Sequence, residues 1–211
     1  MFGYLTREEV LAVIGEPSDS WLSQRDYALF LLMYNTGARV SEIIGIKVGD
    51  VVLDASSACV HLHGKGRKQR SVPLWHTTVK TLRTWLRANP ELTAEAPLLP
   101  NRDGKVMTRS NVTKRLSLAA RVAVGQYPSL SQQHISPHTI RHTTAMHLLQ
   151  AGVDISVIAL WLGHESPVTT HYYVEADLAM KERALARLNE PDAKIQRYRA
   201  PDSLIAFLKT L

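Results

Sequence analysis

The sequence contains very little cysteine: Cys59 is the single one among 211 residues. One cysteine cannot form an internal disulfide, which favours a reducing compartment such as the cytosol. No apolar run approaches the roughly 20 residues that a helix needs to span a bilayer. The opening segment, Met1–Glu9, lacks a basic stretch followed by an apolar one, so it does not resemble a secretory signal. A disulfide-rich secreted protein and a membrane protein are therefore not expected.

Acidic residues are absent from two long tracts, 55–90 and 104–153. These tracts hold 13 of the 25 Lys and Arg residues, although the net charge of the whole chain is only +6. The remainder holds 12 bases against 19 acids, so the positive charge is concentrated rather than spread. Two concentrated basic regions indicate a polyanionic partner such as nucleic acid, and a solubilising surface is the alternative.

Local patterns predict a mainly helical chain with one small antiparallel sheet. Helices are expected at 6–15, 21–36, 40–46, 75–88, 109–124, 137–151 and 154–162, and again after Pro167, over 175–188 and over 202–211. The alternating segment 58–63 and the segment 69–74 are expected to be strands joined by a glycine-rich hairpin turn. Residues 48–53 lead toward another strand, and 125–134 are expected to form a loop.

Three basic side chains share one face of the helix that begins at Pro137. His138, Arg141 and His142 are separated by three and four positions, a spacing that groups side chains on a helix. A solvated polar helix face is the alternative interpretation. A metal site is disfavoured because the glutamate of a His-Glu-x-x-His motif is missing.

Arg39 follows a glycine turn at the end of an apolar helix. Glu42, one helical turn further on, can hold its guanidinium in place, although an ordinary surface arginine is the alternative. Potential metal ligands also alternate along the expected strand 58–63, as Cys59, His61 and His63. A half-exposed strand face is the favoured interpretation of that alternation.

Five motifs follow one another in an order that is specific to one family. They are Thr36–Glu42, Gly64–Lys68, His138-x-x-Arg141-His142, Leu162-Gly163-His164 and Tyr173. Together they resemble the catalytic domain of the tyrosine recombinases, the phage integrase family, in which the tyrosine also stands nine residues after the histidine. The resemblance extends from about Leu5 to Leu188. It implies a mainly α (α+β) fold, a helical catalytic domain with a small three-stranded antiparallel sheet.

The resemblance also implies a reaction, in which DNA is cleaved through a covalent 3′-phosphotyrosine and then rejoined. Tyr173 would be the nucleophile, with the adjacent Tyr172 as the alternative. Lys65 would protonate the 5′-hydroxyl leaving group, with Arg67 and Lys68 as competitors for that role. No cofactor and no metal are implied, because arginines supply the electrostatic stabilisation that a metal would give.

The other catalytic roles are carried over position by position. Arg39 and Arg141 would stabilise the non-bridging oxygens of the scissile phosphate. His138 would assist proton transfer, and His164 would hydrogen-bond the phosphate. Two residues are expected to support these groups: Glu42 and His142. Five basic residues are expected to contact DNA: Arg67, Lys68, Arg70, Lys114 and Arg115.

The resemblance assigns residues 1–190 to the catalytic domain and 191–211 to a C-terminal tail. The helical DNA-binding domain that usually precedes the catalytic domain in this family is expected to be absent, and the chain is expected to be a fragment or a natural short form. The expected assembly is a homotetramer on double-stranded DNA, joined by exchange of a C-terminal helix, and the helix after Tyr173 or the segment 202–211 could provide that contact. The expected function is a site-specific recombinase or integrase of a mobile element in the bacterial cytosol or nucleoid. A type IB-like topoisomerase and a DNA-binding remnant without recombination activity are the alternatives.

Overall fold

A computed structural model of the chain describes residues 3–54, 57–64 and 69–163. These residues all belong to one compact unit, Met1–Asp177. The helices are α1 (Arg7–Ile14), α2 (Trp21–Thr36), α3 (Val40–Ile44), α4 (His76–Ala88), α5 (Arg109–Ala123), α6 (Pro137–Gln150) and α7 (Ile155–Leu162). The strands are β1 (Val51–Val52), β2 (Cys59–His63) and β3 (Gln69–Pro73). The expected helices after residue 163 lie outside the described residues.

Short polar and glycine signals set the helix ends where the sequence predicts them. At the start of α1, the Thr6 hydroxyl accepts a hydrogen bond from the Glu9 backbone, and the Glu9 carboxylate accepts one from the Thr6 backbone at 2.9 Å. The helices α2 and α7 end at Gly37 and Gly163, whose φ angles are 57° and 67°. Glycine adopts this left-handed conformation without the steric cost that a Cβ atom imposes. Both chain reversals contribute to the site described below.

The predicted sheet is present, with strand order β1-β2-β3 and antiparallel pairing throughout. Val60 pairs with Val72, and Leu62 pairs with Arg70. The three apolar members of these pairs are fully buried. The inward face of the sheet therefore carries one arginine beside its apolar side chains.

Two 3₁₀ helices occupy segments where the sequence predicts other structure. The segment 48–53 begins with η1 (Val48–Asp50), so its strand is limited to the two residues of β1. The expected loop 125–134 contains η3 (Pro128–Gln132), and the prediction was wrong there. Proline at the first position favours a helical start, and Leu130 is 2% exposed, so burial of this side chain fixes the segment.

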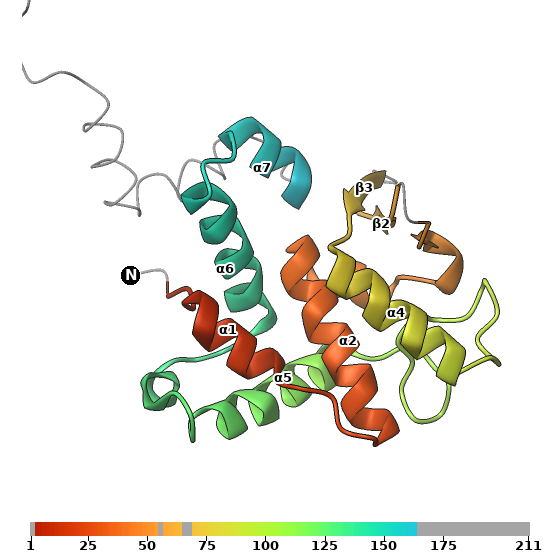
Figure 1. Cartoon of the computed structure of the whole chain (residues 1–211), viewed down its shortest axis with the longest axis horizontal. Helices are drawn as coiled ribbons and strands as arrows, with labels where there is room; N and C mark the ends of the chain where they lie inside the picture. The colour runs from red at the N-terminus through yellow and green to blue at the C-terminus, as the bar shows by residue number, and fades with distance from the viewer. Residues whose placement is uncertain (1–2, 55–56, 65–68, 164–211) are drawn as a thin grey trace, which may run out of the picture. The chain divides into compact units, whose positions relative to one another are not determined.

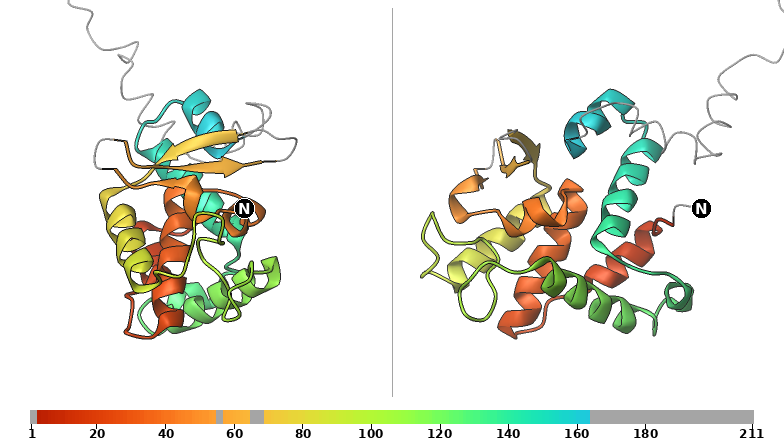
Figure 2. Two further views of the ribbon diagram at one scale, coloured as in Figure 1. Left: turned by 90° about the vertical axis from the view of Figure 1, so that its right-hand side faces the viewer. Right: turned by 180° about the vertical axis from the view of Figure 1, so that it is seen from behind.

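Helix α2 is the central element of the described fold, packed against α1, α4 and α6 (Figure 1). Its residues Leu29, Leu32 and Met33 are almost completely buried in the core. The sheet lies across the ends of the neighbouring helices, with α7 beside β3 (Figure 2). Within the described ranges, no helix has the length and apolarity to cross a membrane.

Candidate active site

The C-terminal end of α7 is bound by three arginines from three different elements. The hydrogen bonds run from Arg70 Nε to Trp161 O at 2.9 Å, from Arg141 Nη2 to Leu162 O at 2.9 Å and from Arg39 Nη1 to Gly163 O at 3.3 Å. The last carbonyls of a helix lack partners within the helix, and its C-terminus carries partial negative charge. Three consecutive carbonyl oxygens can therefore each accept a hydrogen bond from a different guanidinium group. We call Arg39, Arg70 and Arg141 the arginine cluster.

Arg141 is the buried member of the arginine cluster, with 6% exposure. It projects from α6, and its Nη1 also donates to Gly37 O at the end of α2, at 2.6 Å. Gly37 lies so close to α7 that an added Cβ would stand 2.6 Å from the Leu162 side chain. The alternative of a solvated helix face is thus wrong for Arg141, which joins the ends of α2 and α7.

Glu42 is the carboxylate that organises the arginine cluster. Its two oxygens accept from Arg70 Nη1 at 2.7 Å and Nη2 at 3.0 Å, a bidentate pair. The Arg39 backbone N–H also donates to Glu42, at 2.7 Å, whereas the Arg39 guanidinium stands 3.6 Å from the same carboxylate. Burial alone would raise the pKa of Glu42, but the Arg70 and Arg39 hydrogen bonds outweigh it and lower the pKa. The predicted contact of Glu42 with Arg39 is present, but the guanidinium group that lies closer to the carboxylate is that of Arg70.

The structural role of Arg70 is the feature that the sequence interpretation missed. The sequence predicts that Arg70 contacts DNA, yet its side chain is only 14% exposed and is turned toward Glu42. The sequence does contain a usable signal, because the alternation along β2 puts Val60 and Leu62 on one face of the strand. Continuing the alternation across the hairpin places Arg70 opposite Leu62 on that same inward face.

Arg39 is the most exposed member of the arginine cluster, and two predicted histidines lie on the same helix as Arg141. The Arg39 side chain is 43% exposed, and His138 is exposed on the first turn of α6. His142 is half-buried one turn later, with its ring centroid 6.5 Å from that of His138. Burial, followed by the charges of His138 and Arg141, lowers the pKa of His142 and favours its neutral form.

The remaining predicted residues lie on α5, on β2 or outside the described residues. On α5, Lys114 is exposed, whereas Arg115 donates to Asp26 of α2 at 2.5 Å. Six residues with predicted roles lie outside the described residues: Lys65, Arg67, Lys68, His164, Tyr172 and Tyr173. On β2, His61 contacts Ser71 and His63 contacts Asp50. In the described part of the chain, no three potential ligands gather in a way that could hold a metal.

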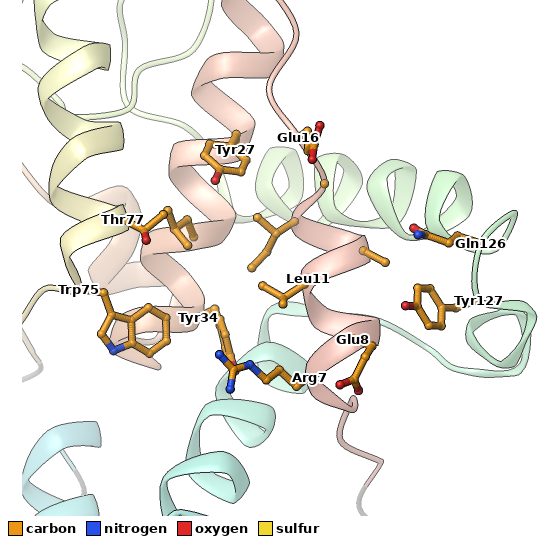
Figure 3. Close-up of a pocket in the computed structure, with 14 residues that line it drawn as sticks. Arg7, Glu8, Leu11, Glu16, Tyr27, Tyr34, Trp75, Thr77, Gln126 and Tyr127 are labelled. Atoms are coloured by element: carbon orange, nitrogen blue, oxygen red, sulfur yellow. The ribbon is translucent and has the colours of Figure 1, made fainter.

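A separate groove of about 1020 Å³ runs between α1, α2 and α4 (Figure 3). Tyr34 and Trp75 meet edge to face on one side of it, with centroids 5.2 Å apart. Leu11 and Arg7 line it from α1. None of the described catalytic candidates borders this groove, so the arginine cluster and not the groove is the candidate active site.

The geometry of the arginine cluster suits a phosphodiester. Arg39 and Arg141 bind adjacent carbonyls, so their guanidinium groups are held near each other by the backbone of α7. Guanidinium groups remain charged and donate several hydrogen bonds, which matches the non-bridging oxygens of a phosphate. Fixing these donors before the substrate binds is the arrangement that stabilises charge in a transition state.

Comparisons with known proteins identify the family to which the chain belongs. The sequence pattern of the Phage integrase family matches residues 3–180. The chain belongs to this family, and its fold is that of a tyrosine recombinase catalytic domain. It is 42% identical over its whole length to y4rC of Sinorhizobium fredii, named as an integrase/recombinase, and covers 63% of that protein. It is 43% identical over 157 residues to the tyrosine recombinase XerC of Neisseria gonorrhoeae, which is 74% of this chain and 48% of XerC.

Solved structures show the same fold. The XerA recombinase is 26% identical with a TM-score of 0.73, over 94% of this chain and 65% of the XerA chain. The XerH site-specific recombinase bound to its difH substrate has a TM-score of 0.73 at 24% identity, over 87% of this chain and 52% of that one. The chain thus spans about half to two thirds of the length of the relatives it matches.

Proposed function

We propose that the chain is the catalytic part of a site-specific DNA recombinase or integrase. The observation that carries this proposal is the pair of guanidinium groups, Arg39 and Arg141, fixed on consecutive carbonyls at the end of α7. Membership of the phage integrase family supports it, as does the naming of relatives as recombinases and integrases. The substrate would be double-stranded DNA in the bacterial cytosol or nucleoid. The recombinase would belong to a mobile element.

The proposed reaction exchanges one phosphodiester for another. The Tyr173 oxygen attacks the scissile phosphorus, the P–O5′ bond breaks, and Lys65 gives its proton to the departing 5′-oxygen. Arg39 and Arg141 stabilise the negative charge that collects on the non-bridging oxygens. His138 accepts the proton that the Tyr173 hydroxyl loses during the attack, and His164 hydrogen-bonds the phosphate. Attack by a new 5′-hydroxyl reverses these steps and releases the tyrosine, so no external energy source is needed.

The proposed organisation follows the family. Residues 1–190 would form the catalytic domain and 191–211 the tail. Four copies would assemble on DNA by exchanging a C-terminal helix. In support, one structural neighbour is a lambda integrase tetramer bound to a Holliday junction, with a TM-score of 0.56.

A suicide DNA substrate, nicked so that the cleaved strand diffuses away, tests the reaction. The wild-type chain should form a covalent adduct with DNA, and Tyr173→Phe should abolish it. The matched control is Tyr172→Phe, which should retain the adduct. An adduct lost in Tyr172→Phe but kept in Tyr173→Phe would move the nucleophile by one residue. If the wild type forms no adduct while it binds DNA, it is a DNA-binding remnant. Relaxation of supercoils without recombination of two sites would indicate a topoisomerase.

A further inference from the structure

Arg70 uses its guanidinium for contacts inside the protein. Among the described residues, the hydrogen bonds of Arg70 go to two internal partners, the Glu42 carboxylate and Trp161 O. Its side chain is 14% exposed, so little of it is presented to a polyanion. Three of its five N–H donors are engaged in these contacts, including the two that form the bidentate carboxylate pair, so a phosphate would not meet the free planar fork. Arg70 therefore does not resemble a DNA-contacting residue.

The internal contacts of Arg70 converge on Arg39 by two routes. Glu42, whose two oxygens Arg70 occupies, accepts the backbone N–H of Arg39 at 2.7 Å. Arg70 also holds Trp161 O, two residues before the carbonyl that binds Arg39 Nη1. One end of Arg39 is thus fixed through Glu42 and the other through the end of α7. Displacing Arg70 would loosen both anchors together.

The turn at Gly163 is shaped around the Arg70 guanidinium. A Cβ built on Gly163 would stand 2.7 Å from Arg70 Nη1 and 2.9 Å from Cζ. The backbone therefore passes in direct contact with the guanidinium, at a residue with φ of 67°. The absence of a side chain at Gly163 is what allows Arg70 to reach both α7 and Glu42.

We infer that Arg70 is a positioning residue for the proposed DNA cleavage, and that it acts by holding Arg39 through Glu42 and through the end of α7. This inference rests on the proposed function, in which Arg39 binds the scissile phosphate. Arg70 does not touch the substrate. It sets the place and the orientation of the guanidinium that does, and small misplacements of such a group are costly for the rate.

Arg70→Lys is the variant that tests this inference, because it keeps the charge and removes the planar fork. Single-turnover cleavage of a suicide substrate, at protein concentrations that saturate the DNA, should slow by roughly 10- to 100-fold. DNA affinity should change little. The matched control is Arg25→Lys: Arg25 is also buried, binds Asp26 through two nitrogens and donates to Pro100 O, but lies outside the site. It should lower stability without slowing cleavage by the folded protein. Equal cleavage rates in the two variants would overturn the inference.

Two modified substrates identify the group through which Arg70 acts. A methylphosphonate at the scissile position removes the charge that Arg39 would bind, so it should reduce the defect of Arg70→Lys relative to the wild type. A 5′-bridging phosphorothiolate, whose sulfur leaves without a proton donor, should leave that defect unchanged. The opposite result, rescue by the phosphorothiolate alone, would mean that Arg70 acts on the proton donor and would refute the inference.

The structure of the variant separates this inference from the proposed function. A crystal structure of Arg70→Lys should show that Arg39 has left Gly163 O and that Glu42 has changed partners. An unchanged Arg39 would refute positioning by Arg70, whatever the chemistry. Failure of the wild type to form any DNA adduct would instead refute the proposed function.

Discussion

Replacing Gly163 by alanine probes the contact between Arg70 and the end of α7. Gly163 has a φ of 67°, and a non-glycine residue pays about 1–2 kcal/mol in the left-handed region. The new methyl group would also stand 2.7 Å from Arg70 Nη1. A free arginine side chain would move aside at little cost, but this one is held by Glu42 and Trp161. Movement weakens at least one hydrogen bond to a charged group, which is worth about 1.5–3 kcal/mol.

The expected cost of Gly163→Ala is therefore about 2.5–5 kcal/mol of the free energy of unfolding, which corresponds to roughly 5–20 °C in Tm for a chain of this size. Gly104 and Gly152 supply matched controls, with φ angles of 75° and 83° and nothing within 4 Å of an added Cβ. Alanine at either position should cost only the backbone component, about 1–2 kcal/mol. Urea unfolding followed by circular dichroism measures all three variants.

A double-mutant cycle attributes the difference to Arg70. In an Arg70→Ala background the methyl group at position 163 has room, so Gly163→Ala should cost no more than the controls. The coupling free energy should be about 2 kcal/mol. If Gly163→Ala matches Gly152→Ala in the wild-type background, or if its extra cost persists without the Arg70 side chain, then the guanidinium does not constrain the turn.

Two further predictions concern pH. The pKa of Glu42 is lowered below 4.5 in the folded state, so its contribution to stability is present above pH 4.5 and is lost as the pH falls through the folded pKa. Glu42→Gln should therefore destabilise the protein by about 3–5 kcal/mol at neutral pH. The same variant should show a smaller loss of stability at acidic pH when unfolding is measured across a pH series. Burial lowers the pKa of His147 below 6.5, against the opposing hydrogen bond with Leu5 O, so stability should fall as the pH drops below 6.5. His147→Phe should remove this slope, and an unaltered slope would assign it to another group.

The elements of the fold were predictable where their signals are local. The capping box at Thr6 and the glycine stops at Gly37 and Gly163 involve residues within one helical turn, and these three helix ends fall where expected. The helix expected at 40–46 is shorter, because α3 ends at Ile44. The alternation predicts a strand at 58–63, and in the structure Val60 and Leu62 of β2 are the buried residues of that alternation. In contrast, η3 depends on the burial of Leu130 by other parts of the fold, which a local pattern does not contain.

The site was predictable as a set of residue types but not as a network. Arg70 and Glu42 are 28 positions apart, and Arg70 and Trp161 are 91 apart, so no spacing rule connects them. The basic tract shows that Arg70 lies among other basic residues, but it does not show in which direction the Arg70 side chain points. Composition cannot distinguish an arginine that faces a ligand from one that faces a carboxylate, and only the strand register makes that distinction.

The pairing of Glu42 with Arg70 has a consequence for Arg39. If Glu42 gave both oxygens to the Arg39 guanidinium, it would neutralise the very charge that the proposed phosphate must meet. Because Arg70 occupies both oxygens, Glu42 holds Arg39 mainly through its backbone, and the guanidinium remains 3.6 Å from the carboxylate and 43% exposed. The fold thereby fixes the position of Arg39 and leaves most of its charge and several donors directed outward. Arg70 is committed to the carboxylate, and Arg39 is thereby positioned without being neutralised, which is the requirement for stabilising a phosphate whose negative charge grows during the reaction.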